Sequence, residues 1–232
     1  MPADRTATDT AAVFESVGLQ VDGTVLLRDV SLRLAAGRTA VIGANGSGKS
    51  TFVRMLNGLR TPTAGSIRVL GFDAVREAAA VRRRVGFVFT NPEAQILMPT
   101  PAEDLALSLR SAPRAERSAR VEEILDRYGL RGLGDVPASA LSGGQRQLLA
   151  IAAVLATEPA LVVADEPTTL LDLRNARRIG DLLLGLDVPL VLVTHDLELA
   201  ARCDEAVLFQ SGTVQAAGDP AAVIEEYRRS CA

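Results

Sequence analysis

A glycine-rich run that ends in lysine, serine and threonine is the first feature that could do chemistry. Its first eight residues match the pattern G-x-x-x-x-G-K-[ST]. The glycines let backbone N–H groups turn toward phosphate oxygens at the positive end of a following helix. The lysine would reach the β- and γ-phosphates, and Ser50 would hold Mg²⁺. The run predicts a site for ATP or a similar nucleotide made by Gly43, Ala44, Asn45, Gly46, Ser47, Gly48, Lys49, Ser50 and Thr51.

The lysine of this run has no counterpart elsewhere in the sequence. The chain has 25 basic residues, and Lys49 is the only one that is not arginine. A compact ammonium group fits between phosphates where a planar guanidinium does not. An accidental glycine-rich turn would have no reason to hold the one lysine at the position that the phosphate pattern requires.

A second candidate element is an apolar run that ends in two carboxylates, Asp165 and Glu166. If residues 161–164 form a strand of a parallel sheet, both carboxylates lie at the sheet edge where open α/β folds bind ligands. Asp165 would then hold the Mg²⁺ shell, and Glu166 would orient and deprotonate the attacking water. The plainer alternative is that the two carboxylates cap the next turn.

These two motifs fit any nucleotide enzyme, and the stretch between them narrows the class. Leu141-Ser142-Gly143-Gly144-Gln145 is similar to LSGGQ, the signature of the ATP-binding cassette (ABC) family, and lies between the two motifs as in that family. The resemblance covers about residues 12–220. It implies that Ser142, Gly143, Gly144 and Gln145 bind the γ-phosphate held by a second protomer. The active unit would be a homodimer or a heterodimer.

Two further positions resemble functional residues of the family. Asp172, after Pro167-Thr168-Thr169-Leu170-Leu171, resembles the acid of the D-loop. His195, the only histidine of the chain, follows an apolar run and resembles the histidine that contacts the γ-phosphate and holds the water. A lone histidine is more often a surface or core residue, so its position in the pattern is the argument for a catalytic role.

Two positions depart from the family. Val21 stands where most relatives have an aromatic residue that stacks on adenine, which predicts weak ATP binding or loose base selectivity. Thr90 stands where the family has a glutamine that links Mg²⁺ and the water to the membrane partner. A threonine hydroxyl can still bind a metal, but its reach is shorter. Thr90 is therefore a candidate Mg²⁺ ligand, whereas Gln95, five residues on, cannot simply take over that role.

The residues after Thr90 suggest which branch of the family the chain resembles. Residues 91–100, Asn-Pro-Glu-Ala-Gln-Ile-Leu-Met-Pro-Thr, are similar to the segment of energy-coupling-factor ATPases that faces a transmembrane protein. That resemblance implies import of a vitamin, with biotin favoured, or of cobalt or nickel. The implied partners are an integral membrane subunit and a small substrate-binding membrane subunit. The alternatives are an ABC ATPase not coupled to transport and a small-molecule kinase, which LSGGQ opposes.

Alternating elements must position these motifs. Strands are expected at 39–42, 67–70, 85–89, 161–164, 190–193 and 206–209, and two more at 13–19 and 25–34 would pair around Asp22-Gly23. Helices are expected at 49–59, 172–186 and 196–202, and residues 93–158 have a mainly helical pattern. The sequence therefore predicts an α/β fold: a P-loop NTPase with a mostly parallel sheet, an N-terminal antiparallel β subdomain and an inserted helical subdomain. Residues 1–11 are expected to be a tail, and 12–232 one ATPase domain.

Composition limits the remaining possibilities. The chain is 48% hydrophobic, 23% charged and has a net charge of −3, as expected for a folded domain without a broad basic surface for nucleic acid. No run reaches the 18 apolar residues of a membrane span, and the polar N-terminus does not resemble a signal peptide. Cys203 and Cys231 have no metal-like spacing. Together with the resemblance to transporter ATPases, these features imply a peripheral subunit at the cytoplasmic side of a membrane.

Overall fold

A six-stranded sheet forms the centre of the chain in the computed structural model, which describes residues 10–35 and 37–231. The sheet has the order β10-β9-β3-β8-β7-β6, and only the β9–β10 pair is antiparallel. Strands β3, β6, β7 and β8 are almost wholly buried, which explains why they read as apolar runs without alternation. The six strands are β3 (Arg38–Ile42), β6 (Val85–Val88), β7 (Leu161–Asp165), β8 (Leu190–Val193), β9 (Glu205–Gln210) and β10 (Thr213–Gly218).

A second, antiparallel sheet has the order β2-β1-β4-β5. Its strands are β1 (Thr10–Val21), β2 (Thr24–Ala35), β4 (Ala64–Val69) and β5 (Phe72–Asp73). β1 and β2 are joined at Asp22-Gly23, where both residues have positive φ, the conformation of a tight hairpin turn. β1 includes Thr10 and Ala11, which the sequence assigned to the tail, because Thr10 pairs with Ala35. The rest of that expected tail, residues 1–9, lies outside the described residues.

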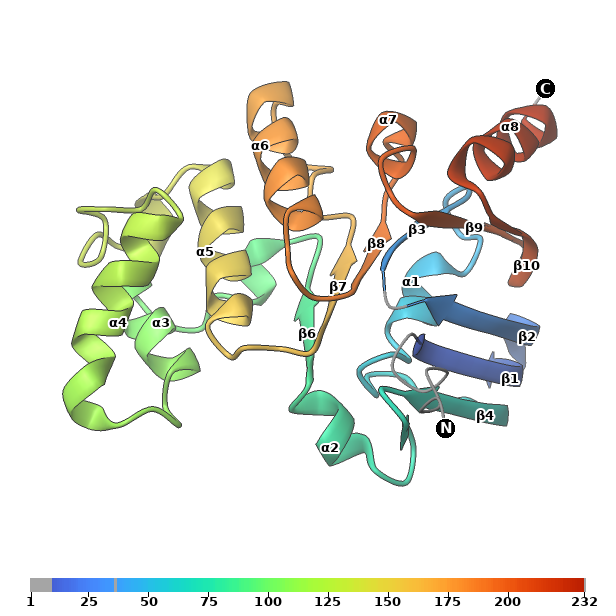
Figure 1. The fold of residues 1–232 in the computed structure, drawn as a ribbon, viewed down its shortest axis with the longest axis horizontal. Helices are drawn as coiled ribbons and strands as arrows, with labels where there is room; N and C mark the ends of the chain where they lie inside the picture. Colours follow the sequence, from blue (N-terminus) through green and yellow to red (C-terminus); the bar gives the residue numbers. More distant parts are fainter. Residues whose placement is uncertain (1–9, 36, 232) are drawn as a thin grey trace, which may run out of the picture.

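Helices cover both sheets and form a separate group (Figure 1). α3, α4 and α5 lie together beyond β6, at the opposite end of the molecule from the second sheet. α6, α7 and α8 lie along the face of the central sheet that points away from the second sheet. The helices are α1 (Lys49–Val53), α2 (Ala78–Arg82), α3 (Pro101–Ser108), α4 (Arg114–Arg127), α5 (Gly143–Leu155), α6 (Leu173–Leu184), α7 (Leu197–Ala200) and α8 (Pro220–Ser230), with short 3₁₀ turns η1 (Pro92–Ala94) and η2 (Ala138–Ala140).

Two hydrophobic clusters hold these layers together, one on each face of the central sheet. On β3, Val41 belongs to the cluster shared with the second sheet, whereas Ala40 and Ile42 belong to the cluster shared with α3–α8. Phe52 packs between two other phenylalanines in the first cluster, with ring centroids 4.5 Å from Phe14 and 4.7 Å from Phe209. This packing fixes α1, and with it the phosphate-binding turn, between the two sheets.

The α/β fold with an antiparallel β subdomain and a group of inserted helices agrees with the sequence prediction. α1 is shorter than expected, because regular helix ends at Val53 and turns continue beyond it. Cys203 is buried, Cys231 is exposed, and both are free thiols. Within the described ranges, none of the helices has the length and apolar character needed to cross a bilayer.

Candidate functional site

The glycine-rich run forms the turn between β3 and α1. Gly43 has φ of 142° and Gly48 has φ of 105°, which a residue with a side chain rarely adopts. A Cβ atom on Gly43 would lie 2.2 Å from the carbonyl oxygen of Phe209, so β9 leaves room only for glycine. The turn therefore brings its backbone to the N-terminus of α1, the geometry that binds phosphate in other proteins.

Lys49 lies over this turn. Its ammonium donates hydrogen bonds to the carbonyl oxygens of Gly43 at 2.8 Å and Ala44 at 2.9 Å. Burial lowers the pKa of Lys49, and the carboxylates of Glu166 and Asp165 act in the opposite direction. Ser47 Oγ is buried and has no hydrogen-bond partner within the described chain. The Ser47 hydroxyl and the Lys49 ammonium can both donate hydrogen bonds to the oxygens of a bound polyphosphate.

A cavity of about 510 Å³ opens above the turn. Residues 45–51 form its floor, Glu166 lies at its edge, and its other walls come from the start of β2 and the β9–β10 turn. The lining residues outside the floor and Glu166 are Thr24, Val25, Leu26, Ser211 and Gly212, and Val21 is not among them. Among the described residues, no aromatic side chain lines this cavity. Thr24 and Val25, rather than Val21, therefore line this cavity.

Ser50 and Asp165 meet beside the cavity. The Ser50 hydroxyl donates to Oδ1 of Asp165 at 2.9 Å, and Arg54 Nη2 lies 3.4 Å from Oδ2. Burial raises the pKa of Asp165, whereas the Ser50 hydrogen bond and the Arg54 charge lower it. A hydroxyl and a carboxylate next to a phosphate site are the hard oxygen ligands that Mg²⁺ takes in nucleotide enzymes, so these residues fit the ion.

Glu166 and His195 are in direct polar contact at the edge of the cavity. His195 Nε2 lies 2.7 Å from Oε1 of Glu166, and Oε2 accepts a hydrogen bond from the Thr169 hydroxyl at 3.2 Å. Glu166 has φ of 52°, an uncommon conformation for a residue with a side chain, and its backbone N–H donates to the Val193 carbonyl. The carboxylate is thus oriented by two partners and by its own backbone at the C-terminal edge of β7.

Thr90 lies directly under this edge. Its hydroxyl donates to the backbone carbonyl of Asp165 at 2.7 Å. Gln95 is held elsewhere: it accepts from the Phe89 N–H at 3.1 Å and donates to the Ala150 carbonyl at 3.0 Å. The structure therefore uses Thr90 as an anchor to β7 and Gln95 as a bridge from β6 to α5. A role for Thr90 as a Mg²⁺ ligand stays a prediction.

The signature residues lie at the start of α5. The Ser142 hydroxyl accepts from the Gln145 N–H, and the Gln145 side chain accepts from the Ser142 N–H, which completes a capping box. Ser142 and Gly143 are exposed, and residues 142–145 do not line the cavity above the phosphate turn. One chain therefore does not bring the signature residues to its own phosphate turn, as expected if they serve a second protomer.

Asp172 begins α6 and caps it. Its Oδ1 accepts from the Asn175 N–H at 3.0 Å, and its Oδ2 accepts from the Asn175 side chain at 2.6 Å. These hydrogen bonds lower the pKa of Asp172. Asn175 also packs against Gly144, where a Cβ atom would lie 2.6 Å from the Asn175 side chain. Asp172 is thus linked to the signature helix through Asn175, and its function in a dimer stays a prediction.

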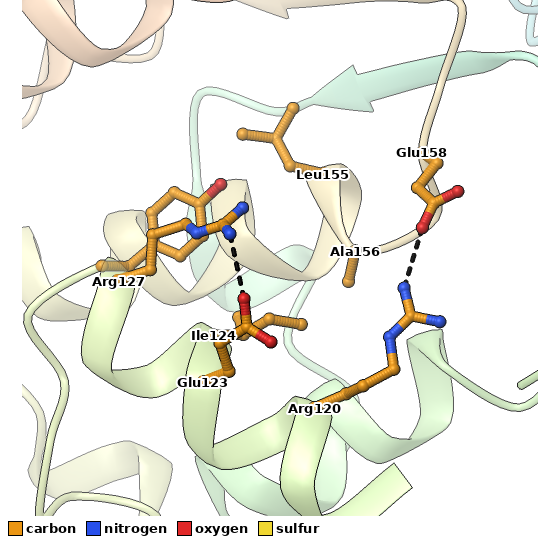
Figure 2. A pocket seen from close by; sticks show the side chains of 8 residues that line it. Arg120, Glu123, Ile124, Arg127, Leu155, Ala156 and Glu158 are labelled. Carbon is orange, nitrogen blue, oxygen red and sulfur yellow. Dashed lines mark hydrogen bonds and ion pairs between the residues drawn. The ribbon is translucent and has the colours of Figure 1, made fainter. Parts of the chain in front are cut away.

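A second hollow of about 220 Å³ lies between α4 and the end of α5 (Figure 2). One ion pair crosses it, Arg120 of α4 with Glu158 after α5 at 2.8 Å, and a second, Arg127 with Glu123 at 3.0 Å, joins successive turns of α4. Each arginine is matched by a carboxylate, and none of the residues predicted to do chemistry lines this hollow. The cavity above the phosphate turn is therefore the site to which the motifs point.

Sequence reasoning missed several residues that the site uses. Arg54 follows Ser50 by four positions on the helical path and so reaches the same carboxylate, a spacing that could have indicated it. Thr169 and Asn175 contact Glu166 and Asp172 across short turns. Val25 follows the hairpin turn, and only the three-dimensional structure shows that it, rather than Val21, lines the cavity.

A phosphate turn beside an oriented glutamate and histidine defines a P-loop nucleotide hydrolase, and the exposed signature motif defines the ABC class. Residues 27–169 match the family model of the ABC transporter. The chain belongs to the ABC transporter family, as the sequence resemblance predicted, and its activity is ATP hydrolysis.

Particular relatives extend this finding. The chain is 42% identical to the biotin transport ATP-binding protein BioM of Rhizobium etli, over 94% of this chain and 98% of BioM. It is similar to the structure of cbiO1 from Clostridium perfringens, part of the ABC transporter complex cbiONQ, with a TM-score of 0.84, 30% identity and 94% and 92% coverage of the two chains. It is also similar to the ATP-binding cassette MJ0796 in a dimeric post-hydrolysis structure bound to ADP and Pi, with a TM-score of 0.78, 28% identity and 90% and 98% coverage. The chain is thus the ATPase motor of a transporter.

Proposed function

We propose that this chain is the motor subunit of an energy-coupling-factor importer that takes up a vitamin, with biotin favoured, or cobalt or nickel. It acts at the cytoplasmic side of the cell membrane as a peripheral subunit. One observation carries the proposal: an intact hydrolytic pair, Glu166 and His195, occurs in a chain similar over nearly its whole length to BioM. The similarity to cbiO1 supports the same branch of the family, and the metal alternative comes from the sequence resemblance.

Hydrolysis follows from the arrangement around the cavity. The turn from Gly43 to Thr51 holds the phosphates, and Lys49 exchanges its two carbonyl partners for phosphate oxygens. Ser50 and Asp165 would hold Mg²⁺, whose charge would offset that of the phosphates. Glu166 accepts a proton from the attacking water. His195 orients the Glu166 carboxylate and would contact the γ-phosphate.

The complete site needs a second protomer. The N-terminus of α5 has backbone N–H groups that can donate hydrogen bonds to an anion, and Gly143 is exposed there. Placed over the γ-phosphate of the partner's nucleotide, Ser142 to Gln145 would close each site. ATP would favour the closed dimer because its γ-phosphate contacts both protomers only in that state. Loss of the γ-phosphate after hydrolysis would remove this preference and open the dimer.

The membrane partner would dock in a groove beside η1. This groove has a volume of about 570 Å³ and lies between the segment 93–99 and the turn before α5. Glu93 and Arg146 lie 3.6 Å apart at one side, and Leu97 nearby is 72% exposed. The segment is bound to both β6 and α5 through Gln95, so movement of a docked helix would reach the phosphate site and the signature helix together.

The test is co-purification. The tagged chain is expressed in its native cell, membranes are dissolved in mild detergent, and the captured proteins are identified by mass spectrometry. The proposal predicts an integral membrane subunit and a small membrane subunit, which is then assayed for bound biotin, cobalt or nickel. Capture of soluble proteins alone, under conditions that preserve a known membrane complex, would instead indicate an ABC ATPase not coupled to transport.

A further inference from the structure

Arginines gather on one surface of the chain, around α2. Residues 59–84 contain six arginines and two acidic residues, a net charge of +4 in a chain whose net charge is −3. Arg84 lies over the Phe72 ring, 4.5 Å from its centroid, and so has a packing role. The others at this surface are exposed. We call Leu59, Arg60, Val75, Arg76, Arg82 and Arg83 the α2 patch.

The fold brings the three segments of the α2 patch together. Gly58 lies against α2 and the segment before it: a Cβ atom there would be 3.5 Å from Arg82 Nη1 and 3.6 Å from the Ala74 carbonyl. Leu59 and Arg60 follow Gly58, and Val75 and Arg76 follow Ala74. In Figure 1, α2 projects from the end of β6, away from the helices α6 to α8.

The charges of the α2 patch are not neutralised within the described part of the chain. No ion pair or side-chain hydrogen bond joins its four arginines to another described residue. The two nearby acids are engaged with backbone: Asp73 accepts from the N–H groups of Val75 and Arg76, and Glu77 accepts from the Asp73 N–H. The guanidinium groups are thus free to bind an external anion.

Two aliphatic side chains belong to the same patch. Leu59 and Val75 are each 48% exposed and precede Arg60 and Arg76 directly in the sequence. A surface with arginines around exposed aliphatic groups suits the boundary of a lipid bilayer, where guanidinium groups meet phosphates and aliphatic groups enter the acyl region. Nucleic acid offers no acyl region for Leu59 and Val75, so these exposed aliphatic groups favour a bilayer surface as the partner.

We propose that the α2 patch binds the anionic headgroups of a phospholipid membrane directly. Each arginine held near an anionic surface adds about 1 kcal/mol of binding free energy, so four give a weak, salt-sensitive attachment. This contact needs no transmembrane partner, because it rests on the charges and aliphatic groups of this surface alone. In an assembled transporter it would hold the ATPase against the membrane.

The experiment is sedimentation of the purified full chain with phosphatidylcholine vesicles, with and without phosphatidylglycerol. The proposal predicts binding at low salt to vesicles that contain phosphatidylglycerol, no binding to phosphatidylcholine alone, and release at high salt. Replacing three arginines, Arg60→Gln, Arg76→Gln and Arg83→Gln, should weaken binding about 100-fold, because each removes roughly 1 kcal/mol and 1.4 kcal/mol is tenfold.

A matched control removes the same charge elsewhere. Arg114→Gln, Arg177→Gln and Arg228→Gln change three arginines on α4, α6 and α8, outside the α2 patch. The control should bind like the wild type, and both variants should keep the wild-type unfolding temperature and ATP affinity. Equal loss in the two variants would reduce the effect to net charge and overturn the proposal. An absence of vesicle binding would also overturn the proposal. Tight binding of a labelled oligonucleotide that is lost only in the patch variant would overturn it as well.

Discussion

The imidazole of His195 lies 2.7 Å from the carboxylate of Glu166, at the edge of the cavity above the phosphate turn. The two residues follow adjacent parallel strands, β8 and β7, whose C-terminal ends meet at the same edge of the sheet. The topology of the sheet therefore places the base and the residue that orients it next to each other in the nucleotide-free chain.

Glu166→Gln should lower the rate of ATP hydrolysis by about 10²–10⁴, the usual contribution of a positioned base. ATP binding should persist, because the amide keeps the shape of the side chain and the phosphate turn is unchanged. The measurement is phosphate release together with nucleotide affinity, with Glu122→Gln on the exposed face of α4 as the control. Turnover near that of the wild type would show that Glu166 is not the base.

Ser142→Arg should abolish the ATP-dependent dimer, since a guanidinium at the start of α5 fills the anion site offered to the partner. The substitution also removes the helix cap, which costs about 0.5–2 kcal/mol. Ser142→Asn keeps a capping side chain and is the matched control. Dimer formation is measured by light scattering with ATP in the Glu166→Gln background. A dimer that forms equally well with and without the Ser142→Arg substitution would contradict the two-protomer site.

Val25 is expected to limit how well the base of the nucleotide is held. No aromatic side chain of the described residues lines the cavity, and stacking of a base on an aromatic ring contributes about 1–3 kcal/mol. ATP and GTP should therefore be hydrolysed with similar efficiency, and Val25→Tyr should tighten binding of both. Val75→Tyr is the control, because Val75 is 48% exposed and Val25 49%. A strong preference of the wild type for ATP would show that another group reads the base.

Thr90→Val should destabilise the fold by about 0.5–1.5 kcal/mol, because the hydrogen bond to the Asp165 carbonyl is lost. Thr90→Ser keeps the hydroxyl and should be close to the wild type. If Thr90 acts only as this anchor, the Mg²⁺ concentration that gives half-maximal hydrolysis stays the same in both variants. An increase confined to Thr90→Val would instead support the sequence-based prediction that Thr90 binds the metal.

The sequence predicted most of the fold because its signals are local. The turn from Gly43 to Ser50 follows an apolar strand and precedes a helix, and the carboxylates follow another apolar strand, so their placement at one sheet edge follows from parallel pairing. β10 and α8 were not predicted, although Asp219 and Pro220 are a recognisable helix start. The hydrophobic pattern of residues 213–218 is too weak to indicate a strand without its partner β9.

The details of the site depend on contacts between distant segments, which no local pattern encodes. The distance from Thr90 to Asp165, the bridge made by Gln95 and the inclusion of Val25 in the cavity wall all result from packing of separate elements. The position of the signature residues relative to the phosphate turn needs a second chain. For that reason the sequence could identify these residues by resemblance, but it could not supply their geometry.

ATP-driven uptake in reconstituted vesicles tests the central proposal most directly. The complex captured through this chain is inserted into proteoliposomes, and entry of labelled biotin, cobalt and nickel is followed with the wild type and with Glu166→Gln. Uptake of one of these is expected to require ATP and to be lost in the variant, although the variant complex still assembles. ATP hydrolysis by the wild-type complex without uptake of any of the three, or uptake that continues in the variant, would contradict the proposal.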